Sequence, residues 1–134
     1  MVKILVVCTH NSARSQMAEA YLRKYLPPEV EIKSAGTHPT GIHPFTIAVM
    51  AEEGYDLSHH TSDPIEKYSS QEWDYIITVC DTAKESCPYL PARFQLHVSF
   101  PDPSKGGIEL FREVRDAIKK WAQEFAQGLH ATLH

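Results

Sequence analysis

Apolar residues gather in short runs and helical stripes that alternate along the chain. Val2 to Val7 form a nearly continuous apolar run rich in β-branched residues, which predicts a buried parallel strand. From Arg14 onward, apolar residues recur at helical spacing until Pro27-Pro28. A helix is therefore expected directly after the polar turn that follows the strand, with Asn11 or Ser12 placed to cap its start.

The same alternation continues to the end of the chain. The pattern next predicts a short strand over residues 30–34 and a helix from Pro44 through Glu53 that is closed by Gly54. A helix cap and first turn follow at Asp63-Pro64, and then a buried strand over Tyr75–Val79. A fourth strand is expected near Phe94 to Val98, and a last helix that ends before Gly128. The order β-α-β-α-β-β-α implies an α/β fold of three layers, α-β-α, around a four-stranded parallel sheet.

The chain is expected to form one domain over residues 1–134. Ligands of such sheets bind at the carboxyl ends of the strands, where Cys8, Cys80 and Asp102 fall.

Composition narrows the function classes. The chain has 134 residues and a formal net charge of -4, which gives no general electrostatic reason to bind nucleic acid or an anionic membrane. Any anion must then be bound by local geometry. The longest apolar run near the start is too short for a secretory or membrane segment, so we expect a cytoplasmic protein, and a monomer. Three cysteines, an odd number, favour reduced and reactive thiols over a disulfide framework.

A thiol and a guanidinium lie at the expected mouth of the first helix, in the pattern Cys-x5-Arg. A loop that curls into a helix start aims several backbone N–H groups at one point, and the helix dipole adds partial positive charge there. That point suits a tetrahedral oxyanion, bound by the loop residues Thr9, His10, Asn11, Ser12, Ala13 and Arg14. The same donors favour the thiolate form of Cys8, which makes it the candidate nucleophile, with Ser15 as a hydrogen-bond donor to the sulfur. The alternative is an ordinary buried cysteine beside a solvated arginine.

Asp102 is the candidate general acid. It lies in Phe100-Pro101-Asp102-Pro103, where two prolines hold the carboxyl group on a rigid loop. Displacement on an oxyanion needs a proton delivered to the departing oxygen, and a positioned carboxylic acid provides it. The alternative is a simple turn aspartate.

Cys80 ends a predicted buried strand, and Cys87 follows seven positions later. In a straight helix their Cα atoms would lie about 10.5 Å apart, beyond the roughly 7 Å that a disulfide can bridge. A disulfide between them would require the segment to refold. We interpret the pair as a redox relay in which Cys80 attacks an adduct on Cys8 and Cys87 then attacks the new disulfide. Two unrelated core cysteines are the alternative.

These motifs together resemble those of a known enzyme family, the thioredoxin-coupled arsenate reductases, which share the low-molecular-weight protein tyrosine phosphatase fold. The resemblance spans nearly the whole chain and rests on Val6 through Ala20, Ser34-Ala35-Gly36, Thr61 through Ile65, Val79-Cys80, Cys87-Pro88 and Pro101-Asp102-Pro103. It implies that arsenate binds the loop, Cys8 attacks arsenic and Asp102 protonates the departing hydroxide. It further implies that arsenite leaves as a Cys8–Cys80 disulfide forms, and that a Cys80–Cys87 disulfide is then reduced by thioredoxin.

The resemblance also implies a possible potassium ion near the loop, and no other cofactor. The matching positions are Asn11, Glu19, Ser34, Thr61 and Asp63, all with oxygen ligands. They could equally form a hydrogen-bond network that braces the loop. Ala13 departs from the many relatives that have a further cysteine there, a residue outside the relay. Relatives differ in using thioredoxin or glutaredoxin, and the Cys80/Cys87 spacing resembles the thioredoxin type.

Three other functions compete with this interpretation. A low-molecular-weight phosphotyrosine phosphatase would use the same Cys8, Arg14 and Asp102, but such enzymes usually carry aromatic residues where Ser104-Lys105 follow here. A sensor could bind arsenite or a metal through the three thiols as soft ligands. Zinc binding by the histidines is not supported by their spacing, since His130 and His134 lie in an expected frayed tail.

Overall fold

The computed structural model describes residues 2–80 and 92–133. Within them the elements are β1 (Lys3–Cys8), α1 (Arg14–Tyr25), β2 (Glu31–Gly36), α2 (Pro44–Glu52), the 3-10 turn η1 (Ile65–Lys67), β3 (Tyr75–Thr78), β4 (Phe94–His97) and α3 (Ile108–Leu133). Apart from η1, this is the predicted order. The strand positions predicted from the apolar runs are confirmed to within one or two residues.

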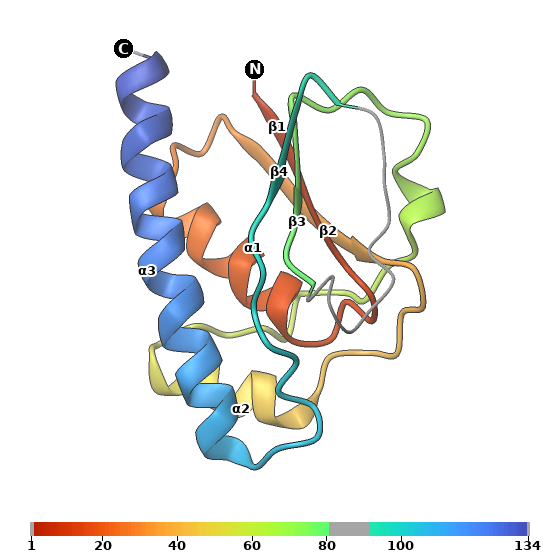
Figure 1. Ribbon diagram of the computed structural model, residues 1–134, viewed down its shortest axis with the longest axis vertical. Coiled ribbons are helices and arrows are strands. Elements are labelled where there is room, and N and C mark those ends of the chain that lie inside the picture. Colours follow the sequence, from red (N-terminus) through yellow and green to blue (C-terminus); the bar gives the residue numbers. More distant parts are fainter. Residues whose placement is uncertain (1, 81–91, 134) are drawn as a thin grey trace.

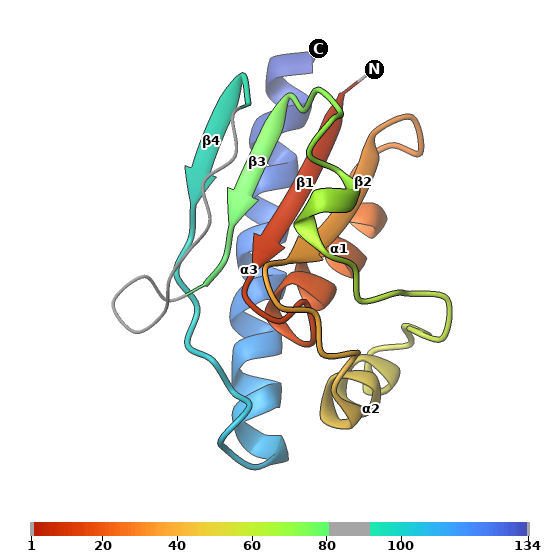
Figure 2. The ribbon, with the colours of Figure 1, turned by 90° about the vertical axis from the view of Figure 1, so that its right-hand side faces the viewer.

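The four strands form one parallel sheet in the order β2-β1-β3-β4. Figure 2 shows the four arrowheads pointing the same way, so the carboxyl ends of all strands share one edge. The register places Cys8 opposite Gly36 on one side of β1, and Val7 opposite Thr78 on the other. The predicted α/β class with a four-stranded parallel sheet is confirmed.

Side chains of β1 alternate between the two faces of the sheet. Ile4, Val6 and Cys8 join the larger core cluster with α1, α2 and α3, whereas Leu5 and Val7 join a smaller cluster on the other face. Figures 1 and 2 show α1 and α3 packed along one face and the η1 segment lying on the other. The second cluster includes the aromatic residues Tyr68 and Trp73 from that segment. Both faces are covered, which gives the three layers.

Two expectations about helix ends are wrong. No side-chain cap begins α1, whose N-cap residue is Ala13, because the Asn11 side chain instead bonds to Ser34 O and Ser15 Oγ. The last helix does not end before Gly128 but continues to Leu133. Leu129 is buried beyond that glycine, and packing of this kind outweighs the roughly 1 kcal/mol that a helical glycine costs.

The expected cap at Asp63-Pro64 is also wrong. Pro64 is the N-cap residue of η1 and makes no side-chain cap bond, and η1 is a single short turn. The Asp63 carboxylate is engaged elsewhere, since it accepts hydrogen bonds from Thr61 Oγ1 and Tyr68 OH. Among the described helices, none is both long and apolar enough to cross a membrane.

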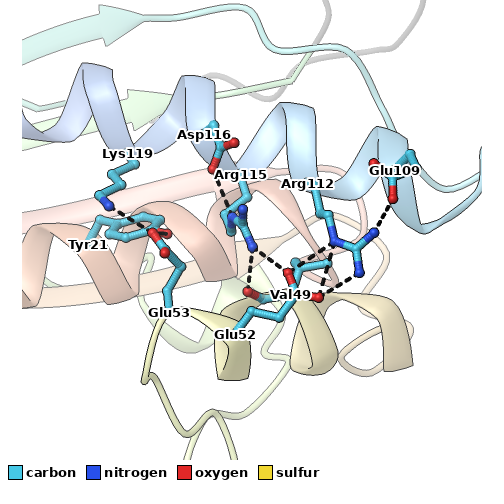
Figure 3. A network of polar contacts seen from close by, with 9 residues as sticks. All are labelled: Tyr21, Val49, Glu52, Glu53, Glu109, Arg112, Arg115, Asp116 and Lys119. Carbon is cyan, nitrogen blue, oxygen red and sulfur yellow. Dashed lines mark hydrogen bonds and ion pairs between the residues drawn. The ribbon is translucent and has the colours of Figure 1, made fainter.

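A network of ion pairs joins α2 to α3 below the sheet (Figure 3). Glu52 accepts hydrogen bonds from Arg112 at 2.7–3.1 Å and from Arg115 at 2.8 Å, while Lys119 donates to Glu53 at 2.8 Å. The hydrogen bonds from Arg112 and then Arg115 lower the pKa of Glu52 from 4.5 to about 2. Glu52 is therefore ionised in the folded protein at every pH above that value.

We predict that Glu52→Gln lowers the melting temperature at pH 7 by a few degrees. In the unfolded chain Glu52 titrates near its ordinary pKa, so its contribution to stability is complete above about 4.5 and is lost as the pH falls toward about 2. The melting-temperature gap between parent and variant should therefore close across that range. Glu124→Gln, the same chemical change at an exposed position on α3, is the matched control. A gap that stays constant down to pH 2 would contradict this assignment.

Candidate active site

The backbone carbonyls of the loop between β1 and α1 are all engaged on the side away from Cys8. Residues 9–13 accept, in turn, from His38 N, Thr40 N, Gln16 Nε2, His43 N and Met17 N at 2.8–3.2 Å. In a trans peptide the N–H points opposite to the C=O, so the N–H groups of residues 10–14 face the inner side of the loop. Asn11 N shows this direction, because it donates to Cys8 Sγ at 3.3 Å. The loop is thus a concave set of N–H donors.

Cys8 lies at the centre of this concave loop. It is the last residue of β1, is 2% exposed and is a free thiol. Its Sγ lies 3.0 Å from Ser15 Oγ, on the first turn of α1. The uncapped start of α1 adds the positive end of the helix dipole to the same point. A thiolate at Cys8, or an anion in front of it, would be stabilised by all of these donors.

Two residues give the loop its shape. Asn11 adopts a left-handed backbone conformation with φ of 48°, which asparagine tolerates better than most residues. Its side chain is fixed on both sides, because Nδ2 donates to Ser34 O and Oδ1 accepts from Ser15 Oγ at 2.7 Å. Gly36 lies against the loop: a Cβ added there would stand 2.7 Å from Thr9 O and 2.9 Å from Asn11 N. Only glycine fits this close approach.

Arg14 links the loop to the chain that follows β4. Its guanidinium is 3% exposed, donates from Nη1 to Phe100 O at 3.2 Å, and places Nη2 4.0 Å from Asp102 Oδ2. The Asp102 carboxyl is 33% exposed and accepts from Ser104 N at 2.9 Å. The structure therefore brings together Cys8, Arg14, Ser15 and Asp102, as the sequence predicts. Of the Arg14–Asp102 pair, Asp102 is the side that solvent reaches.

Cys80 leaves the sheet beside Cys8. Val79 N donates to Val7 O at 3.0 Å, so the two cysteines follow neighbouring strands at the same edge. Cys80 is fully buried and disulfide-bonded. Cys87, and the refolding of the segment before it that the predicted relay requires, lie outside the described residues.

The residues predicted for potassium are joined by hydrogen bonds. Ser34 Oγ donates to Glu19 Oε1, and Thr61 Oγ1 donates to Asp63 Oδ2. All but Asn11 line a small cavity of about 130 Å³ that Arg23 and Lys67 also line. Arg23 pairs with Glu19 at 2.9 Å and Lys67 with Asp63 at 3.6 Å. Because each carboxylate has a cationic partner, the arrangement fits the bracing network, and potassium binding stays a prediction.

Gln16 and His60 are buried parts of this network that the sequence interpretation missed. Gln16 is fully buried on the first turn of α1, and its Oε1 lies 2.9 Å from His60 Nδ1. Burial lowers the pKa of His60, so its imidazole is neutral at pH 7. The only sequence feature that could have indicated this network is the polar Gln16 at the start of a helix that begins at the loop. Its partners Thr61 and His60 come from a segment distant in sequence, which the sequence pattern does not reveal. The described residues contain no cluster of His, Cys, Asp or Glu that could hold a metal ion.

A family model agrees with this geometry over almost the whole chain. The model of the low molecular weight phosphotyrosine protein phosphatases matches residues 3–134. The chain belongs to this family. It is therefore an enzyme of the low molecular weight phosphatase fold, as the motifs predicted.

Relatives within the low molecular weight phosphatase family include reductases. The chain is 40% identical to the arsenate reductase of Halalkalibacterium halodurans over 131 residues, covering 92% of this chain and 94% of the relative. A solved structure described as an arsenate reductase in the phosphate binding state superposes with a TM-score of 0.83 at 32% identity, covering 96% and 98% of the two chains. An arginine phosphatase from Geobacillus stearothermophilus has a TM-score of 0.80 at 23% identity over 98% and 95%, which shows the shared fold alone.

We predict that Gly36→Ala disrupts this family's loop in the present chain. The added methyl group would push against backbone atoms of Thr9 and Asn11, which cannot rotate away, so the free energy of unfolding should fall by about 1–3 kcal/mol. Chemical denaturation measures this change. Gly128→Ala is the matched control, since a Cβ there meets nothing within 4 Å and alanine favours the helix. Equal stability of Gly36→Ala and the parent would contradict the close approach.

Proposed function

We propose that this enzyme is an arsenate reductase that uses Cys8 as its nucleophile. The observation that carries the proposal is the free Cys8 thiol facing the inward N–H groups of the loop, with Arg14 beside it. Arsenate reductases among its relatives, and the phosphate binding state of one solved neighbour, support an oxyanion in this position. The geometry of the loop offers donors on several sides, which suits a tetrahedral anion.

In the proposed first step, arsenate binds in the concave loop and Cys8 attacks arsenic. The inward N–H groups and the Arg14 guanidinium hold the arsenate oxygens and stabilise the charge that develops on them. A sulfur–arsenic bond forms while an arsenic–oxygen bond breaks. Asp102 gives its proton to the departing hydroxide, which leaves as water. The 33% exposure of the Asp102 carboxyl supports this role, since the product water can reach solvent.

The proposed second step moves oxidation from arsenic to sulfur. The Cys80 thiolate attacks Cys8 Sγ and a disulfide forms. The electron pair of the sulfur–arsenic bond goes to arsenic, which falls from As(V) to As(III) and leaves as arsenite. Cys87 then attacks Cys80, which frees Cys8 as a thiolate and leaves a Cys80–Cys87 disulfide for the reductant. Support comes from the neighbouring strands that carry Cys8 and Cys80.

Thioredoxin is the proposed reductant, with glutaredoxin as the alternative. The proposal rests on the Cys80/Cys87 spacing, which resembles the thioredoxin-coupled family. A dithiol reductant attacks one sulfur of the disulfide and resolves the mixed disulfide with its second thiol. A cytoplasmic location, where such reductants keep thiols reduced, and a monomeric state complete the proposal.

The main competing function is that of a phosphatase. Phosphate and arsenate share shape and charge, and the same three residues, Cys8, Arg14 and Asp102, would hydrolyse a phosphate ester through a phosphocysteine. The family to which the chain belongs is named for that activity. We propose that phosphate-ester hydrolysis is a weak side activity here, because Ser104-Lys105 follow the Asp-Pro pair and provide no aromatic grip on a substrate ring.

One set of variants separates these functions. NADPH consumption is measured with arsenate, thioredoxin and thioredoxin reductase for the parent, Cys8→Ser, Cys80→Ser and Cys87→Ser, with glutaredoxin in a parallel arm. Hydrolysis of para-nitrophenyl phosphate is measured alongside. All three variants should lose arsenate turnover by about a thousandfold or more, while only Cys8→Ser loses ester hydrolysis, because only Cys8 forms the first covalent bond.

Other results would favour the alternatives. If Cys80→Ser and Cys87→Ser turn over arsenate like the parent, the relay is wrong. If the parent hydrolyses the phosphate ester but consumes no NADPH with arsenate, the chain is a phosphatase. If the parent binds arsenite tightly but consumes no NADPH with arsenate, the thiols form a sensor. Faster turnover with glutaredoxin than with thioredoxin would show that glutaredoxin, not thioredoxin, is the reductant.

The choice between potassium binding and the bracing network is tested separately by thermal unfolding in KCl and NaCl at equal ionic strength. We expect equal melting temperatures, because Arg23 and Lys67 already neutralise Glu19 and Asp63. A higher melting temperature in KCl that disappears in Asp63→Asn would instead place a potassium ion at these residues.

A further inference from the structure

Gln16 makes a set of buried hydrogen bonds that none of the steps above uses. Its Nε2 lies 3.0 Å from Asn11 O, 3.1 Å from Asn11 Oδ1 and 2.9 Å from Thr61 O. Both Gln16 and Asn11 are fully buried, so water does not satisfy these groups. The amide therefore connects the inner face of the loop to the segment that follows α2.

These contacts fix which end of the Gln16 amide faces the loop. Three acceptor oxygens surround one end, so that end is the NH₂ group, which donates. The other end, Oε1, then faces His60 Nδ1 at 2.9 Å and accepts from it. His60 is 13% exposed on its side chain and neutral at pH 7, and it carries its proton on Nδ1 to make this bond. A flipped amide would set an oxygen against three oxygens.

Ser15 faces a choice between two acceptors. Its hydroxyl has one hydrogen, and Oγ lies 2.7 Å from Asn11 Oδ1 and 3.0 Å from Cys8 Sγ. When the hydrogen points to Asn11, the hydroxyl can only accept from a Cys8 thiol. When it points to Cys8, it stabilises the thiolate, but the buried Asn11 Oδ1 loses a donor. Such an unsatisfied buried acceptor is costly.

We propose that Gln16 is a positioning residue that releases the Ser15 hydroxyl to the Cys8 thiolate. The Gln16 amide supplies the second donor to Asn11 Oδ1, so this oxygen stays satisfied when Ser15 turns to the sulfur. The side-chain partners of Gln16 are Asn11, Thr61 and His60, so it acts on Cys8 through Asn11 and Ser15. The inference rests on the proposed role of Cys8 as a thiolate nucleophile.

The test is the pH profile of Cys8 alkylation by iodoacetamide in the reduced protein, with the Cys8 peptide followed by mass spectrometry. Gln16→Met keeps the length of the side chain and removes the amide. The midpoint of the profile should rise by about one pH unit, which is a tenfold loss of thiolate at a given pH below it. The pH profile of para-nitrophenyl phosphate hydrolysis should shift by the same amount, with rates converging at alkaline pH.

Two controls make the test specific. Gln123→Met applies the same chemical change on the exposed face of α3, where Gln123 donates to Tyr25 OH, and should leave the midpoint unchanged. In the Ser15→Ala background, Gln16→Met should give no further shift, because there is no hydroxyl left to release. If the midpoint stays unchanged, or shifts equally in both backgrounds, Gln16 does not act through Ser15 and the proposal fails.

A second variant keeps the test decisive should Gln16→Met not fold. Gln16→Leu also removes the amide and adds no charge, so the same dependence on Ser15 is expected. The alkylation profile needs no arsenate turnover. Failure of the proposed reductase activity would appear in the NADPH assay alone, and failure of the Gln16 role would appear in the alkylation cycle alone.

Discussion

The site depends on one constraint: every carbonyl in residues 9–13 has a hydrogen-bond donor on the outer side of the loop. Because each peptide is planar and trans, engaging the carbonyls outward turns the following N–H groups inward. Without those outer donors, some carbonyls would turn toward the inner side of the loop, and their partial negative charge would cancel the positive potential of the N–H groups there. The segments that carry the donors therefore belong to the proposed anion site.

The parallel sheet does the remaining positioning. Strands β1 and β3 are neighbours and run the same way, so Cys8 and Cys80 emerge side by side at one edge. Asp102 lies near that edge because it follows shortly after β4, whose carboxyl end lies there, and Arg14 is bonded to Phe100 O on the same segment. The guanidinium thereby joins the helix start to the acid. A thiol that faces loop N–H groups, a carboxyl group beside the arginine and a second cysteine are the parts that the proposed reductase mechanism uses.

Sequence expectations failed where other contacts compete with a local preference. Asn11 was expected to cap α1, but its side chain is bound to Ser34 and Ser15 and shapes the loop instead. Asp63 was expected to cap a helix and is held by Thr61 and Tyr68. Gly128 was expected to end α3, yet the helix continues with Leu129 buried. At Asn11 and Gly128, a contact with a residue distant in sequence or burial in the core overrode a local preference of at most about 1–2 kcal/mol, whereas at Asp63 other nearby side chains compete for the carboxylate.

The sequence by itself determined the strands, most of each helix and the parallel sheet, and it placed Cys8, Arg14 and Asp102 near one edge of that sheet, because periodicity and motif spacing are local properties of the chain. Only the tertiary structure decided how the loop is held. The hydrogen bonds that join Gln16 to Thr61 and His60 span more than forty residues, and no local pattern encodes their geometry. The sequence predicted a hydrogen bond from Ser15 to Cys8, but only the folded structure brings Asn11 Oδ1 within reach of the same hydroxyl.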